Sequence, residues 1–147
     1  MEDYPINLQD INVLLVEDNK SDARLMKEFL NEIDVKNLHI VEDGIEALNH
    51  LHNHCKPQNK YPHLIILDLN LPRKDGREVL KDIKNDNELK IIPVIVLTTS
   101  NSEEDINECY NNYANCFITK PVELDEFTNA IELITEFWLK MSKLPPY

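Results

Sequence analysis

Four short hydrophobic segments of this chain end at polar residues suited to chemistry. They read VLLVED (13–18), LIILD (64–68), VIVLT (94–98) and CFITKP (116–121). Unbroken apolar runs of about four to five residues are typical of parallel strands that are covered on both faces. We therefore predict strands over 12–16, up to 68, up to 98 and around 117–118, with a further short strand at 38–41.

Segments with helical spacing of apolar residues alternate with these strands. They cover 21–32, 44–54, 76–85, 103–112 and about 123–143, and Ser102 is placed to cap the fourth of them. The stretch 55–63 reads as a loop. Five alternations of strand and helix predict an α/β fold, a doubly wound five-stranded parallel sheet with an extended C-terminal helix.

Length and composition fit one globular domain with a short segment at each end. The chain has 147 residues, and we divide it into an N-terminal arm (1–10), a domain (11–134) and a C-terminal extension of the last helix (135–147). A formal net charge of −12 argues against nucleic acid or an anionic membrane as a direct partner. Three cysteines without paired spacing, and no long apolar run, favour a cytoplasmic protein.

Polar residues at the strand ends predict a binding site. Because the carboxyl ends of parallel strands meet at one edge, we expect Glu17, Asp18, Asp68, Thr98 and Lys120 to lie together. Taken singly, such an aspartate can cap a turn, such a threonine can bond locally and such a lysine can be solvated surface. Clustered carboxylates instead favour Mg²⁺, and Mg²⁺ with one lysine would leave the site near neutrality, ready for a phosphoryl group.

These residues carry a resemblance to a known family. VEDNKSDARLMKEFL, LIILDLNLPRKDGREVL, PVIVLTTS and CFITKPVELDEF resemble, in this order, the blocks of two-component response-regulator receiver domains, over about residues 11–134. The resemblance implies a flavodoxin-like sheet of strand order 2-1-3-4-5. It further implies that Asp68 is the phosphoacceptor, which attacks a phosphohistidine on a sensor histidine kinase. Beyond Mg²⁺-dependent self-phosphorylation and self-dephosphorylation, no enzyme activity is implied.

The resemblance also assigns metal ligands. Asp18 and Asp68 would bind Mg²⁺ through their carboxylates, Glu17 through water and Asn70 through its main-chain carbonyl. Many receiver domains carry Asp–Asp where this chain has Glu17–Asp18, and the longer glutamate suits a water-mediated contact.

Further residues match the family's switch. Lys120 would pair with the phosphoryl group, Thr98 would move to hydrogen-bond it, and Phe117 occupies the place of the switch aromatic. Family members usually have a cis bond before the proline, so we expect Lys120–Pro121 to be cis. Thr99 stands where many members have a small residue, and the sequence leaves its effect on dephosphorylation open.

The final helix is longer than one domain needs and carries two apolar stripes. We expect one stripe to cover the sheet and the other to form a homodimer interface that includes Leu133, Phe137, Trp138 and Met141. The ending FWLKMSKLPPY resembles that of single-domain regulators serving cyanobacterial-phytochrome-type histidine kinases, which implies a homodimer without an output domain. Output would then pass through protein contacts rather than DNA binding.

Three other functions fit the same residues less well. An aspartate-nucleophile phosphatase resembles DxDx[ST], but Asn70 replaces the second aspartate, which acts as the general acid. A flavodoxin-like cofactor protein needs a phosphate loop where Glu17 and Asp18 would repel phosphate. A pseudo-receiver, which acts only as an interaction module without phosphorylation, stays open as the main alternative.

Overall fold

The computed structural model describes residues 7–147, whose five strands form one parallel sheet. The strands are β1 (Asn12–Val16), β2 (Asn37–Val41), β3 (Leu64–Leu67), β4 (Val94–Thr98) and β5 (Cys116–Thr119). Their order is β2-β1-β3-β4-β5, with every neighbouring pair parallel. The predicted fold class and strand order are confirmed.

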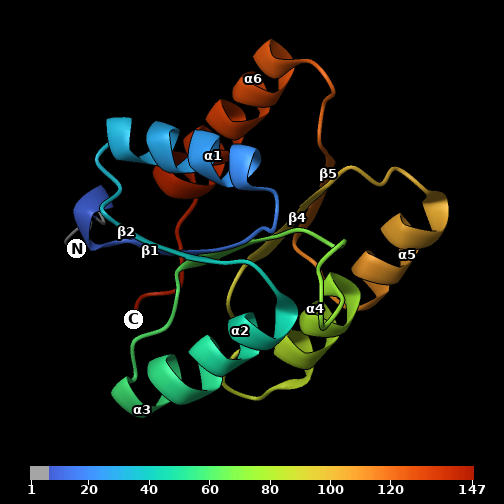
Figure 1. The fold of residues 1–147 in the computed structure, drawn as a ribbon. Helices are drawn as coiled ribbons and strands as arrows, with labels where there is room; N and C mark the ends of the chain where they lie inside the picture. Colours follow the sequence, from blue (N-terminus) through green and yellow to red (C-terminus); the bar gives the residue numbers. More distant parts are fainter. Residues whose placement is uncertain (1–6) are drawn as a thin grey trace.

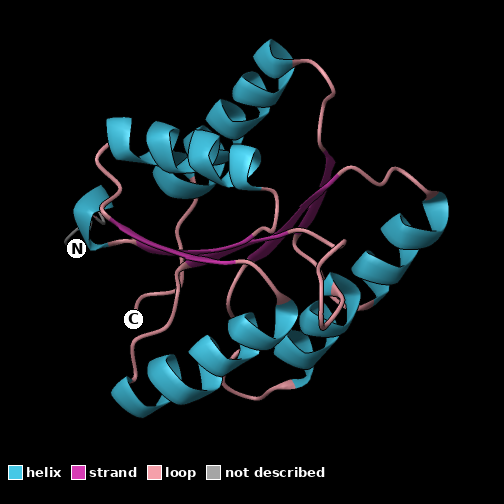
Figure 2. Cartoon of the chain, viewed as in Figure 1, coloured by secondary structure: helices cyan, strands magenta, loops and turns pink. Residues whose placement is uncertain are grey.

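Helices cover both faces of the sheet (Figure 1). They are α1 (Lys20–Glu32), α2 (Gly44–Asn49), the π-helix η2 (His50–Cys55), α3 (Lys56–Gln58), α4 (Gly76–Asn85), α5 (Glu103–Asn111), α6 (Leu124–Ile134) and the π-helix η3 (Thr135–Met141). Helices α1 and α6 lie on one face and α2 to α5 on the other, so the domain has three layers, as Figure 2 also shows.

One helical segment differs from the sequence-based expectation. The chain stays helical from Gly44 through Gln58, so the predicted loop at 55–63 is shorter than expected. Pro57 lies inside this helical stretch, in α3, which directly follows the π-helix η2. The helix ends at Asn59, whose φ of 52° is left-handed. The last helix runs through η3 to Met141, close to the predicted end.

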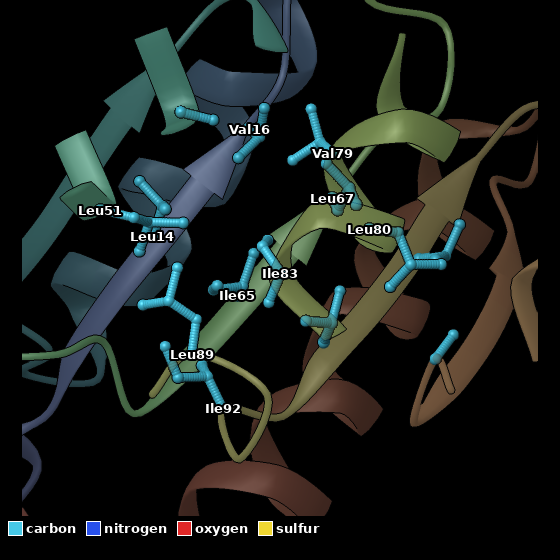
Figure 3. Close-up of a cluster of buried hydrophobic side chains, with 14 of the residues drawn as sticks. Leu14, Val16, Leu51, Ile65, Leu67, Val79, Leu80, Ile83, Leu89 and Ile92 are labelled. Atoms are coloured by element: carbon cyan, nitrogen blue, oxygen red, sulfur yellow. The ribbon is translucent and has the colours of Figure 1, made fainter. Parts of the chain in front are cut away.

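Alternate strand residues build two hydrophobic clusters, one on each face of the sheet. From β1, Leu14 and Val16 enter one cluster, while Val13 and Leu15 enter the other. Figure 3 shows the first cluster, in which side chains from β1 and β3 meet those of α4. Burial on both faces explains why the strands read as continuous apolar runs.

The segment 135–147 packs back onto the sheet. Leu139 and Leu144 are buried in the cluster that also holds α1 and α6 side chains. The Tyr147 hydroxyl donates to the Pro62 carbonyl at 2.5 Å. Of the predicted arm 1–10, residues 1–6 lie outside the described residues, and Leu8–Asp10 form the 3-10 turn η1. No helix in the described part of the chain is both long and apolar enough to cross a membrane.

Gly76 holds the start of α4 against the end of β3. A Cβ at this position would lie 2.1 Å from the Asp68 carbonyl oxygen and 2.6 Å from the Leu69 Cα, which are backbone atoms. Helix propensity alone would make alanine more stable by about 1 kcal/mol. We expect Gly76→Ala to lower the unfolding free energy by about 2 kcal/mol or more, because forced overlap in a packed region exceeds that gain.

Urea unfolding measures this loss. Lys81→Ala, at an exposed position of the same helix, is the matched control and should change stability by less than about 0.5 kcal/mol. If the Gly76→Ala protein is as stable as the wild type, the close approach of Gly76 to the backbone of Asp68 and Leu69 does not constrain the start of α4.

Candidate functional site

The carboxyl edge of the sheet brings together side chains that are distant in the sequence. Glu17 and Asp18 follow β1, Asp68 follows β3 and Lys120 follows β5. The Lys120 ammonium donates to Asp68 Oδ2 at 3.2 Å and to Asp22 Oδ2 at 3.0 Å, and it forms a shorter contact with Glu17 Oε1. One buried cation therefore faces three carboxylates.

Three of the site's carboxylates are close enough to share an ion. Glu17, Asp18 and Asp68 each offer an oxygen, and these oxygens all lie within 4.8 Å of one another. Glu17 and Asp68 are only 2% and 6% exposed, whereas Asp18 is open to solvent. Oxygen donors with one solvent-facing side fit a hard divalent cation that keeps several water ligands, such as Mg²⁺.

Burial and charge set the protonation of this cluster. Burial raises the pKa of the Glu17 carboxyl to about 8, and the Asp68 charge adds to the rise, whereas the Lys120 hydrogen bond opposes it. Burial alone would lower the pKa of Lys120, but its bond to Glu17 and the charges of Glu17 and Asp68 outweigh burial and raise it. Lys120 therefore stays charged, and a divalent cation would favour the ionised carboxylates.

Asn70, Thr98 and Phe117 take no part in the ion pairs of this cluster. The Asn70 N–H donates to Asp68 Oδ1 at 3.3 Å. Thr98 is fully buried at the end of β4, and its hydroxyl accepts a long local bond of 3.4 Å from the Ser100 N–H. Half-buried Phe117 packs against the cluster of Figure 3. The structure thus places Thr98 at the expected edge, with its hydroxyl bonded locally.

The expectation of a cis bond between Lys120 and Pro121 is wrong. Residues 7–147 contain no cis peptide, so this bond is trans. Trans is the favoured form by about 0.5–1 kcal/mol even before proline. In this form the Lys120 ammonium already reaches Glu17, Asp22 and Asp68, so the observed ion pairs do not require the cis form.

Sequence reasoning missed Asp22 as a partner of Lys120. Asp22 lies in the first turn of α1, where its backbone N–H is capped by the Asn19 side chain at 3.0 Å. Acidic residues are favoured in the first turn of a helix, at the positive end of the helix dipole, so the place of Asp22 in α1 could be inferred from the sequence. Its approach to Lys120 was not readable, because that contact joins positions 98 residues apart.

The ion pair between Arg77 and Asp105, close to Thr98, was also not predicted from the sequence. The Arg77 guanidinium of α4 donates to both carboxylate oxygens of Asp105 in α5, at 2.7 and 2.8 Å. The Ser100 hydroxyl donates to the same carboxylate at 2.5 Å. The bond from Arg77 holds the pKa of Asp105 below its usual range. The bonds of Asp105 to Arg77 and Ser100 therefore connect the loop after Thr98 with the start of α4.

A groove opens from the site between α1 and the loop after β5. It has a volume of about 610 Å³ and is lined by side chains that include Leu25, Thr99, Lys120 and Val122. Val122 and Leu124 are 98% and 66% exposed. Apolar side chains that are open to solvent beside a charged site are suited to docking a partner.

Fold and site together define a receiver domain. Residues 13–132 match the response regulator receiver domain family, and the chain belongs to this family. It is 44% identical over 135 residues to response regulator Rcp1 of Synechocystis sp. (strain ATCC 27184 / PCC 6803 / Kazusa), covering 90% of this chain and 92% of that protein.

Two crystal structures of relatives share the fold. The Mn²⁺-bound form of response regulator Rcp1 superposes with a TM-score of 0.86 at 43% identity, covering 92% of this chain and 99% of that one. The phosphorylated cyanobacterial phytochrome response regulator RcpA gives a TM-score of 0.85 at 46% identity, with the same coverage. The predicted resemblance to receiver domains of this group is confirmed.

Proposed function

We propose that this protein is a phosphoacceptor response regulator, which takes a phosphoryl group from a sensor histidine kinase onto Asp68 with Mg²⁺. The observation that carries the proposal is the ion-pair cluster of Lys120 with Asp68, Glu17 and Asp22 beside three oxygens within 4.8 Å. Metal binding and phosphorylation in similar proteins, Rcp1 and RcpA, support it. Free thiols at all three cysteines suit a cytoplasmic location.

In this reaction an Asp68 oxygen attacks phosphorus, the phosphorus–nitrogen bond of the phosphohistidine breaks, and the imidazole leaves with the bonding electrons. Asp18, Asp68, the Asn70 carbonyl and, through water, Glu17 would hold Mg²⁺, which supplies positive charge to the phosphoryl oxygens. Lys120 would neutralise a further oxygen. Thr98 would exchange its long bond to Ser100 for one to the phosphoryl group, and Phe117 would shift with it.

The groove beside the site suits the kinase. Its walls come from α1 and from the loop after β5, and exposed Val122 and Leu124 flank Lys120. An apolar surface next to the phosphoacceptor would hold the helix that presents the phosphohistidine. The similarity to RcpA makes a phytochrome-like kinase our proposed partner.

Labelling with a small phosphodonor tests this function against the pseudo-receiver alternative. Incubation with acetyl phosphate and Mg²⁺, followed by intact mass spectrometry, should show one added phosphoryl group. The same incubation with EDTA should leave the mass unchanged, because the transfer needs the cation. An unmodified protein in Mg²⁺ would favour an interaction module that is not phosphorylated.

We further propose a homodimer through the outer face of α6 and η3. Leu133, Phe137 and Met141 are 69%, 50% and 74% exposed, and Trp138 is half-buried beside them. An apolar groove of about 420 Å³ runs from β5 along this face. A second copy of the chain would cover these apolar side chains, which are otherwise exposed to water. Signalling would then use protein contacts, which the net charge of −12 also favours over DNA.

Phe137→Glu tests the interface. A buried charge at the centre of such a contact should weaken the dimer by about 2 kcal/mol or more, roughly 30-fold. Light scattering after size exclusion should show a dimer for the wild type and a monomer for the variant. Glu132→Gln, at an exposed polar position of α6, is the control and should stay dimeric. A dimeric Phe137→Glu protein would place the interface elsewhere.

A further inference from the structure

Three histidines gather on the edge strand β2 and the π-helix η2 beside it. The rings of His39 and His50 are stacked, with centroids 3.9 Å apart and planes at 8°. The ring of His54 lies 5.8 Å from that of His50 and is tilted by 35°. None of the proposed phosphoryl-transfer residues belongs to this cluster.

The ring nitrogens of this histidine cluster (His39, His50 and His54) are available to a ligand. Within residues 7–147, none of them has a hydrogen bond, and His39 and His54 are exposed. Buried His63 is the contrast, because its Nδ1 accepts from the Asn12 N–H at 3.0 Å and its Nε2 bonds the Tyr147 carbonyl at 2.9 Å. The cluster therefore lacks the hydrogen bonds that mark a structural histidine here.

The spacing of two of these histidines suits a metal ion. His50 and His54 are four positions apart on one helical face, which is a chelating spacing for histidine pairs. Two nitrogens on a tetrahedral Zn²⁺ lie about 3.3 Å apart. Among the described residues, only Glu17, Asp18 and Asp68 already place three ligand atoms within 4.8 Å of one another, so the histidine rings would have to turn to close on an ion.

We propose that His39, His50 and His54 bind one borderline divalent metal ion of the Zn²⁺ or Cu²⁺ type. His39 now faces His50 with parallel planes, so its exposed ring must turn for its nitrogen to converge on the ion. Imidazole ligands select Zn²⁺, Cu²⁺ or Ni²⁺ rather than Mg²⁺, which separates this site from the carboxylate cluster.

The charged residues nearby favour one of two depressions beside the histidine rings as the place of the ion. One depression, of about 480 Å³, is lined by the three histidines together with Glu46 and Asn49. A second depression, also lined by the three histidines, includes Lys36 and Lys60, whose charges repel a cation. The ion would therefore bind on the Glu46 side and tie β2 to η2.

Zn²⁺ titration of the full chain tests the site. Calorimetry is run in excess Mg²⁺, so that the carboxylate cluster is already occupied. We expect saturation at one Zn²⁺ per chain, and long-range ¹H–¹⁵N spectra should show shifts of the His39, His50 and His54 nitrogens but not those of His63. His54→Ala should weaken binding by more than about tenfold, since even losing a partner outside the ligand shell costs about 10- to 100-fold.

Two variants complete the test. His52→Ala, at an exposed position of the same π-helix, should bind Zn²⁺ like the wild type. His50→Ala should lose saturable binding, with circular dichroism confirming its fold. If His54→Ala and His50→Ala retain wild-type affinity, or if Zn²⁺ leaves the three histidine spectra unchanged, the proposal is overturned.

Discussion

Asp68→Asn should abolish phosphoryl labelling by acetyl phosphate in Mg²⁺. The amide nitrogen's lone pair is delocalised and the amide oxygen carries no full charge, so neither atom can replace the carboxylate as nucleophile. The amide keeps the side chain's shape beside Lys120 and the Asn70 N–H, so the fold should survive. Intact mass spectrometry should show an unmodified chain after an incubation that phosphorylates the wild type fully.

The matched control is Asp82→Asn, which changes a part-exposed aspartate on α4 that pairs with Lys74. It removes the same charge from the chain and should leave labelling intact. Labelled Asp68→Asn protein, with the phosphoryl group found on another residue, would contradict the assignment of Asp68. Loss of labelling in both variants would point to charge or folding rather than to the nucleophile.

Lys120→Met should strongly destabilise the protein when no divalent cation is present. Lys120 is the only cation that contacts Glu17 and Asp68 in the described part of the chain, and both carboxylates are buried. Breaking a buried ion pair by removing one partner costs about 3–5 kcal/mol, because the remaining charge is uncompensated. Urea unfolding in EDTA at pH 8 should show a loss of this size.

Mg²⁺ should reduce that loss, whereas a lower pH should stabilise the variant and the wild type alike. Mg²⁺ brings positive charge to the same oxygens, so the variant should gain more stability from Mg²⁺ than the wild type does. The pKa of Glu17 is raised by burial and would rise further without Lys120, so the folded chain keeps a proton that the unfolded chain releases. The stability of the variant and that of the wild type should therefore both rise as the pH falls from 8 towards 6.

Lys140→Met is the matched control, since Lys140 lies exposed on η3 and pairs only with Glu136 at 3.3 Å. An exposed pair of this kind contributes less than about 1 kcal/mol. Equal stability of Lys120→Met and wild type in EDTA would mean that the carboxylates are protonated even beside the lysine.

Most secondary structure followed from local pattern. The strand at 12–16 and the helix at 76–85 have the bounds that apolar runs and helical spacing predicted, and Ser102 caps α5 by accepting from the Asp105 N–H at 3.1 Å. The stretch 55–63 was predicted as a loop, whereas the chain stays helical through Gln58.

The candidate site was only partly visible in the sequence. Strand-end positions indicated Glu17, Asp68 and Lys120, since strand order and parallel direction bring such ends to one edge. Asp22 was not identified, because its contact depends on how the first turn of α1 lies relative to Lys120, which follows β5. The trans bond before Pro121 was also missed, since isomer choice depends on the local surroundings rather than on residue type.

The sequence by itself determined the alternation of strands and helices, the family and the residues able to act as nucleophile, metal ligands and cation. The alternation follows from periodicity and the candidate chemistry from residue type, which are local properties of a chain. The family and the role of Asp68 as nucleophile follow from the resemblance of four ordered sequence blocks to those of receiver domains. Only the tertiary structure decided which side chains face each other: Lys120 with Asp22, Arg77 with Asp105, and His39 against His50. Such contacts depend on packing angles and rotamers across distant segments, which no spacing along the chain specifies.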